Sequence, residues 1–98
     1  MKHELKTVQP YFNDVRTGKK KFEVRKNDRG FKVGDELILK EYNKDTNAYT
    51  GEVLEMVITY ILDSEEYCKD EYVILGIESI WDSFSRYIQE NCVNKKEI

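Results

Sequence analysis

The sequence of 98 residues has few of the residue types that secreted, membrane-bound and redox proteins depend on. It contains one proline, one histidine, one tryptophan and two cysteines. No run of about 18 apolar residues occurs, so we expect no membrane-spanning helix. The opening MKHELKT lacks the apolar segment of a signal peptide. These absences together predict a cytoplasmic protein.

The motifs of common enzyme classes are missing as well. The chain has no GxSxG nucleophile motif, no Walker phosphate loop and no HExxH zinc motif. Cys68 and Cys92 fit no zinc-binding spacing, so we expect two free thiols, no metal and no cofactor. By residue type alone, the lone His3 is more typical of a surface or strand residue than of a catalytic base.

What is present is the composition of one small folded domain. Hydrophobic residues make up 40% of the chain and charged residues 36%, and the charges interleave with apolar runs instead of forming a disordered block. We expect a single monomeric domain over residues 1–98, with a frayed tail at about residues 94–98.

Charge is distributed unevenly along the chain. Residues 1–40 contain eleven Lys and Arg against six Asp and Glu, a net charge of +5. Residues 41–98 contain five against thirteen, a net charge of −8, which gives −3 overall. An acidic protein does not bind polyanions indiscriminately, but a local basic site can still bind a phosphate or a short nucleic-acid segment.

The hydrophobic pattern predicts one early helix, several short strands and a C-terminal helix. Turn residues separate the strands. This order is typical of a mostly β fold with flanking helices (α+β), built as a small barrel or a strongly curved sheet. The expected helix covers residues 7–18, and the expected strands cover residues 21–25, 36–42, 52–62 and 72–80, with a polar hairpin loop at residues 43–51.

The strand KFEVR alternates strictly between apolar and charged residues. We expect Phe22 and Val24 to face the core, and Lys21, Glu23 and Arg25 to emerge together on the opposite face, about 7 Å apart. Two interpretations remain open. The charged face is either a solvated, charge-paired surface or an oriented constellation that lines a cleft.

The turn KNDRG follows this strand and adds candidate ligand-binding groups. Asn27 and Asp28 are typical turn residues, while Arg29 and Lys26 flank the turn with cations. Arginine offers a planar fork for a phosphate or a base edge, and asparagine can pair with a base. These residues indicate a small pocket for a nucleotide.

Aromatic residues give a second signal. Phe31, Tyr42 and Tyr49 lie near the polar loops, where rings can stack on bases, although core packing is the commoner role in so short a chain. In the C-terminal segment, Trp81, Phe84, Tyr87 and Ile88 follow helical spacing, and we expect this stripe to belong to the core.

Several stretches resemble a known family. These are HELKT at residues 3–7, PYFNDVRTGKKKFEVRKNDRGFKVGDELILKEY at residues 10–42, TGEVLEMVITYI and YVILGI. Together they resemble the ASCH domain of the PUA-like superfamily, and more closely its short uncharacterised bacterial and phage proteins that open with a HELK-type stretch. The resemblance covers residues 3–80, and GKKKFEVRKNDRGFKVGD is its most specific part.

The resemblance implies a PUA-like β-barrel that binds RNA or a nucleotide-like ligand in a cleft beside the first helix. The family's motif falls on Gly18, Lys20, Glu23 and Arg25. In a closed barrel the first strand would also bring His3 and Lys6 to this cleft. Together with the turn residues Asn27, Asp28 and Arg29, the candidate ligand-binding residues are therefore His3, Lys6, Lys20, Glu23 and Arg25.

Two alternative functions follow from other features. One ASCH branch is similar to an amidohydrolase of acetylated cytidine, which would make Lys20 a base and leave Glu23, in place of that branch's threonine, to activate water. A carboxylate does not replace a hydroxyl nucleophile, so we favour a binding module. Glu71 and Glu78 are candidates for that branch's distant glutamate. The acidic loop at residues 63–71 could instead bind a basic protein partner.

Overall fold

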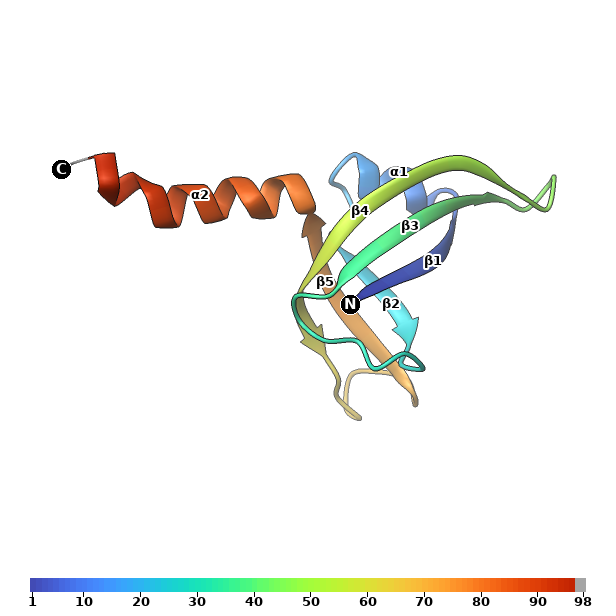
Figure 1. Cartoon of the computed structure of the whole chain (residues 1–98). Coiled ribbons are helices and arrows are strands. Elements are labelled where there is room, and N and C mark those ends of the chain that lie inside the picture. The colour runs from blue at the N-terminus through green and yellow to red at the C-terminus, as the bar shows by residue number, and fades with distance from the viewer. Residues whose placement is uncertain (97–98) are drawn as a thin grey trace.

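The protein is a curled five-stranded half-barrel, with one short helix packed on its inner face and one long helix that projects from its end (Figure 1). The computed structural model describes residues 1–96, with side chains up to residue 89. This architecture confirms the expected mostly β fold with flanking helices. The elements are β1 (Lys2–Val8), α1 (Tyr11–Arg16), β2 (Phe22–Lys26), β3 (Glu36–Asn43), β4 (Ala48–Leu62), β5 (Tyr72–Ser79) and α2 (Ile80–Lys96).

The sheet has the strand order β1-β3-β4-β5-β2, so β1 and β2 form its two edges. β1 runs parallel to β3, and all other neighbouring strands are antiparallel. Within residues 1–96 no backbone ladder joins β1 to β2. The curl is therefore open along one seam, and this seam separates two strands that both come from the basic part of the sequence.

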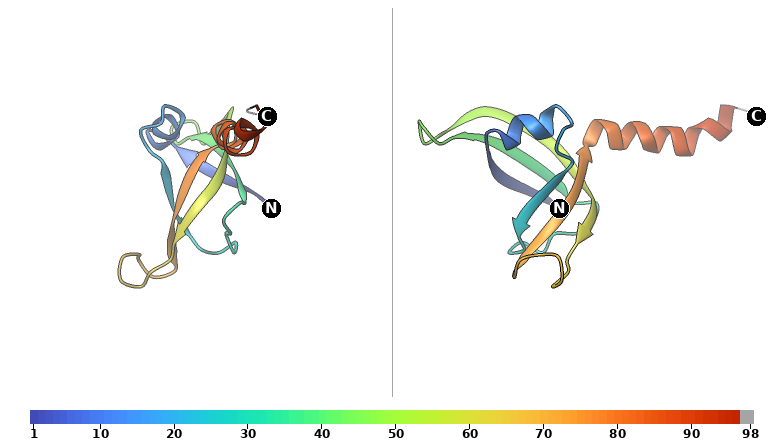
Figure 2. Two further views of the ribbon diagram at one scale, coloured as in Figure 1. Left: turned by 90° about the vertical axis from the view of Figure 1, so that its left-hand side faces the viewer. Right: turned by 180° about the vertical axis from the view of Figure 1, so that it is seen from behind.

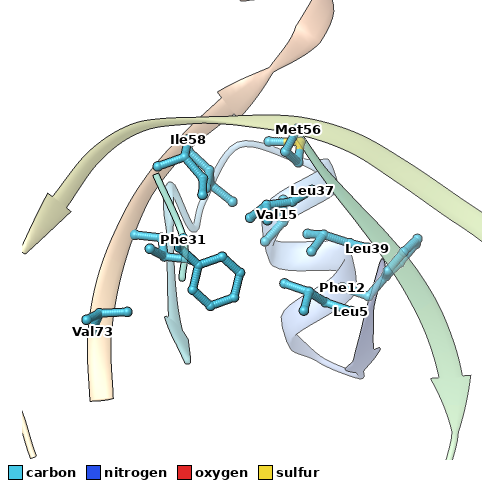
Figure 3. Packing of buried hydrophobic residues seen from close by; sticks show 11 residues of the cluster. Leu5, Phe12, Val15, Phe31, Leu37, Leu39, Met56, Ile58 and Val73 are labelled. Carbon is cyan, nitrogen blue, oxygen red and sulfur yellow. The ribbon is translucent and has the colours of Figure 1, made fainter. Parts of the chain in front are cut away.

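The core fills the inner face of the curl. Figure 3 shows Phe12 and Val15 of α1 pointing toward Leu5 of β1 and toward Leu37 and Leu39 of β3. A helix thus occurs within the predicted range of residues 7–18, but it covers only Tyr11–Arg16, because Thr7 and Val8 belong to β1. Leu37 and Leu39 are fully buried, and the remaining members of the cluster are Phe31, Met56, Ile58, Val73, Leu75 and Ile77.

Local sequence signals explain the ends of α1. Pro10 stands immediately before the helix, where its missing N–H costs no hydrogen bond. After the helix, Gly18 adopts a φ of +82°, and its amide donates to the carbonyl of Val15 at 3.1 Å. A glycine reaches this left-handed conformation without steric cost, and here it turns the chain from α1 toward β2.

The predicted orientation of β2 is wrong. Phe22 and Val24 are about half exposed, while Glu23 is 3% exposed and faces the interior. The pairing with β5 decides the orientation, because Glu23 lies opposite the buried Leu75 and Arg25 opposite the buried Val73. Residues directly opposite one another on antiparallel strands point to the same face. The alternation in the sequence shows that successive side chains point to opposite faces of the sheet, but it does not determine which set faces inward.

The C-terminal stripe is also placed differently from the prediction. Trp81 is 75% exposed, Phe84 52%, Tyr87 59% and Ile88 39%. α2 begins at Ile80, directly after β5 ends at Ser79, so no loop turns the helix back onto the sheet (Figure 2). The radius of gyration is 15.6 Å, against about 13 Å for a compact chain of this length. Helical spacing correctly predicted the helix but not its burial.

Three further segments complete the comparison. β1 was not evident from periodicity, because two of its three inward residues, His3 and Thr7, are polar. β4 begins at Ala48, inside the segment expected to be a hairpin loop. The segment expected to fray includes the last residues of α2, which ends at Lys96, and residues 97–98, which lie outside the described part of the chain. Neither helix in the described chain is long and apolar enough to cross a membrane.

Candidate ligand-binding cleft

A cleft of about 450 Å³ lies at the seam where β1, the start of α1 and β2 meet. Each element contributes a short run of residues, because the curl of the sheet brings its two edges together. Its lining combines three cations and one carboxylate with a hydroxyl and several apolar or aromatic side chains. They are Lys6, Thr7, Val8, Tyr11, Lys20, Phe22, Glu23, Val24 and Arg25.

Glu23 is the centre of a buried ionic cluster in this cleft. One carboxylate oxygen accepts a hydrogen bond from the Lys20 ammonium, and the other accepts one from the Arg25 guanidinium at 2.9 Å. The side chains of Lys20 and Arg25 are only 16% and 24% exposed, so these pairs are largely shielded from water. Such a cluster holds its members in fixed positions, since leaving any one unpaired inside the protein is unfavourable.

Arg25 also bridges the open seam of the half-barrel. Its guanidinium donates to the carbonyl of Lys6 at 3.1 Å and to the hydroxyl of Thr7 at 3.2 Å, both on β1. Arg29 does the same farther along, donating to the carbonyl of Glu4 at 2.8 Å. Two arginines thus satisfy carbonyl groups along the free edge of β1, where a neighbouring strand would otherwise pair.

Aromatic rings flank the lysine of the cluster. The Lys20 ammonium lies 5.1 Å from the centre of the Phe22 ring and 5.8 Å from that of Tyr11. Both rings are about half exposed at the mouth of the cleft. Cation–π attraction adds to the ion pair in positioning Lys20, and the exposed parts of the two rings leave apolar surface for a flat ligand group.

His3 does not line the cleft. It is buried on the inner face of β1, where its Nε2 atom lies 2.8 Å from a carboxylate oxygen of Asp35 and its ring packs edge-on against Phe31. Asp35 also accepts a hydrogen bond from the amide of Lys32 at 3.1 Å. The hydrogen bond with His3 is the largest cause of a lowered pKa for Asp35. This network joins β1 to the start of β3, so its role is to stabilise the fold.

The turn residues lie beside the cleft and not in it. Asn27, Asp28 and Arg29 are exposed, and the amide of Asn27 donates to the carbonyl of Glu71 at 2.7 Å. Arg29 shares the seam with Arg25 but contacts β1 two residues away from the cleft. Of the eight predicted residues, the structure therefore brings together Lys6, Lys20, Glu23 and Arg25.

Sequence reasoning missed the apolar wall and the hydroxyl of the cleft. Thr7 and Val8 follow Lys6 on β1, and Tyr11 begins α1. Motif spacing gave no sign of Thr7. Tyr11 could have been found, because it lies within the predicted helix at residues 7–18, shortly before the basic motif.

The candidate acids for an amidohydrolase are outside the cleft. Glu71 lies in the loop before β5 and is paired loosely with Lys26 at 3.9 Å. Glu78 forms an ion pair with Arg86 at 2.8 Å and lines a separate hollow beneath the start of α2, which Lys20 also borders. Among the described residues, no group of three or more His, Cys, Asp or Glu side chains is placed to hold a metal ion.

The two remaining sequence features are placed as follows. Cys68 is a free, half-buried thiol, while the side chain of Cys92 lies outside the described residues. In the acidic loop, Asp63, Glu65, Glu66, Asp70 and Glu71 are all exposed. A basic protein partner for this loop remains a prediction.

The fold and the cleft define the class of this protein. It is a small, mostly β domain with an ion-paired cleft at the seam of its half-barrel. Residues 2–77 match the model of a family described as a domain of unknown function, DUF3850, and the chain belongs to this family. The matched region runs from β1 into β5 and contains the whole cleft, while α2 lies beyond it.

A relative in Escherichia phage P2 is described as an uncharacterised 12.9 kDa protein in the GpA 3′ region. It is 41% identical over 73 residues, which are 74% of this chain and 64% of that protein. The chain therefore spans less than two thirds of the relative's length. The expected kinship with short uncharacterised phage proteins is confirmed, whereas the ASCH relationship stays a prediction.

Proposed function

We propose that this protein is an ASCH-type, PUA-like module that binds RNA or a nucleotide-like ligand in the seam cleft. The observation that carries the proposal is the convergence of Lys6, Lys20 and Arg25 with the rings of Tyr11 and Phe22 in one cleft. Cations at such a site neutralise phosphate, and exposed rings stack on bases. A volume of about 450 Å³ is within the range of small-ligand pockets.

In this proposal Glu23 positions the cations and does not contact the ligand. Both of its carboxylate oxygens are hydrogen-bonded to Lys20 and Arg25, and the residue is 3% exposed. Each cation has further N–H groups to offer. Phosphates of the ligand therefore bind Lys20 and Arg25 while the cluster stays intact, and the exposed Lys6 on β1 binds a further phosphate.

The proposal is tested by titrating labelled short RNAs and a panel of nucleotides at low and moderate salt. We expect Arg25→Ala to weaken binding about ten-fold, the loss of one charge-assisted contact. Arg86→Ala is the matched control, because Arg86 lies on α2 and pairs with Glu78. Equal binding by wild type and Arg25→Ala, or no binding by either, would show that the assignment is wrong.

One observation favours a second candidate function, an amidohydrolase of modified nucleosides. The hydroxyl of Thr7 lies in the same cleft and accepts a hydrogen bond from Arg25 at 3.2 Å, so a hydroxyl is present although the motif carries Glu23. Incubation with acetylated cytidine tests this candidate. The candidate is supported if wild type forms product and both Lys20→Ala and Thr7→Val do not. It is excluded if wild type forms no more product than these variants.

A further inference from the structure

Beside the cleft, and sharing Lys6 with it, two lysines and two tyrosines form a continuous patch on the outer face of β1, β3 and the start of β4. The Lys6 ammonium lies 4.4 Å from the ring centre of Tyr42. The rings of Tyr42 and Tyr49 meet edge to face at 5.1 Å, and the Lys40 ammonium lies 5.0 Å from the Tyr49 ring. We call these four residues, Lys6, Lys40, Tyr42 and Tyr49, the tyrosine–lysine patch.

Strand register explains why these residues gather. Lys6 pairs with Lys40 across the parallel β1–β3 ladder, and Tyr42 pairs with Tyr49 across the antiparallel β3–β4 ladder. Their neighbours in sequence, Leu5 and Leu39, face the core, so Lys6 and Lys40 point outward. Tyr49 is 52% exposed. The patch therefore presents aromatic and cationic groups to solvent from three adjacent strands.

The patch is joined to the cleft through Lys6. This residue lines the cleft and also contacts Tyr42. Two acidic side chains border the patch: Glu4 bonds the Lys40 ammonium at 3.1 Å, and Glu41 bonds Gln9 and Thr50. Glu41 is thus directed away from the lysines. An anionic ligand that binds Lys40 would have to replace Glu4 as its partner.

From this continuity we infer that the ligand is a single-stranded nucleic acid of several nucleotides, which runs from the cleft over the edge of β1 onto the tyrosine–lysine patch. This inference rests on the proposed function of the cleft. A mononucleotide carries a single base, which cannot stack on the rings of the cleft and on those of the patch at once. A longer strand places further bases against Tyr42 and Tyr49 and further phosphates beside Lys6 and Lys40, which is how unpaired strands are commonly bound.

The alternative role of the patch is purely structural, because cross-strand aromatic and cation–π pairs also stabilise a β-ribbon. The two roles differ in what they predict for ligand length. If the patch binds the strand, affinity rises with the number of nucleotides, and the gain depends on Tyr49. If the patch only stabilises the ribbon, a mononucleotide and an octamer lose affinity equally when Tyr49 is replaced.

The experiment measures fluorescence anisotropy with uridine monophosphate as competitor and labelled oligouridylates of two, four and eight nucleotides, with an oligodeoxyuridylate series that differs only in lacking the 2′-hydroxyl. We expect Tyr49→Ala to weaken octamer binding about ten-fold relative to mononucleotide binding, the effect of losing one stacking ring. Tyr49→Phe keeps the ring and should keep the affinity. Tyr67→Ala, an exposed tyrosine in the acidic loop, is the matched control.

The outcomes separate this inference from the function on which it rests. The extended site is wrong if the octamer and the mononucleotide bind with equal affinity, or if Tyr49→Ala changes both affinities equally. In that case, binding that depends on Arg25 still supports the cleft. Absence of binding by any RNA, DNA or nucleotide overturns both. A preference for the ribose series over the deoxyribose series identifies RNA as the ligand, and circular dichroism checks that each variant is folded.

Discussion

At the scale of single residues, Glu23 decides how the cleft is built. A carboxylate on the inner face of a curled sheet is unfavourable unless it is paired, and here Lys20 and Arg25 pair both of its oxygens. Arg25 is in turn bonded to β1. The same residue therefore holds the cations of the cleft and, through Arg25, connects the two edges of the sheet.

The stability of the protein should depend on the charge of Glu23. We expect Glu23→Gln to lower the free energy of unfolding by about 2 kcal/mol, the value of hydrogen bonds to a charged group that are lost or weakened inside a protein. Urea unfolding measures this change. Glu65→Gln, in the exposed loop, is the control and should change stability little. A loss for Glu23→Gln no larger than for this control would contradict the buried cluster.

Asp35 should make stability depend on acid pH. Its pKa is lowered in the folded protein, first by the hydrogen bond with His3 and also by the amide of Lys32. A lowered folded-state pKa stabilises the protein above the unfolded-state pKa, near the ordinary 3.8. That stabilisation is lost as the pH falls through the folded-state pKa.

Urea unfolding measured from pH 5 down to pH values below about 4 tests this dependence. Wild type should lose more stability than Asp35→Asn as the pH falls below about 4, because the amide does not titrate. Parallel stability curves for the two proteins in this range would show that Asp35 contributes no such linkage.

At the scale of elements, β2 and α2 show the limits of periodicity. Both were expected where they occur, yet β2 turns its charged side inward and α2 leaves its apolar stripe exposed. The inward side of β2 is set by its pairing with β5, and the exposure of α2 by its direct continuation from that strand. Both features depend on how elements pair and connect in the folded chain, which a local window of sequence does not reveal. β1 is the converse case, since its polar inward residues conceal a strand.

The exposure of α2 can be measured directly, because Trp81 is the sole tryptophan and is 75% exposed. We expect the fluorescence of the folded protein to be quenched by acrylamide nearly as efficiently as that of the urea-unfolded chain. Its emission maximum should shift little on unfolding. A blue-shifted, poorly quenched emission at low protein concentration would mean that α2 packs onto the domain.

At the scale of the whole molecule, curling converts a charge asymmetry along the chain into one in space. The first forty residues carry the basic excess, and both strands that border the seam belong to them. The acidic remainder supplies β4, β5 and the loop between them. An acidic protein can thereby present a basic cleft, since its opposite charges lie on different parts of the sheet.

Ligand binding at this cleft should weaken with salt in proportion to the cations engaged. With Lys6, Lys20 and Arg25 each neutralising one phosphate, the logarithm of affinity should fall with the logarithm of salt concentration at a slope of about −2, from about −0.7 per phosphate on a single strand. Arg25→Ala should reduce that slope by about 0.7. Affinity independent of salt would contradict phosphate binding by these residues.

The sequence by itself determined the mostly β class and a helix within residues 7–18, and the family resemblance grouped the residues Lys20, Glu23 and Arg25. Local propensity, turn chemistry and motif spacing carry this information. Only the tertiary structure decided which side of β2 faces inward, that His3 belongs to Asp35 and not to the cleft, and that Thr7 and Tyr11 complete it. The reason is that alternation specifies a period, whereas burial depends on which distant strand lies opposite.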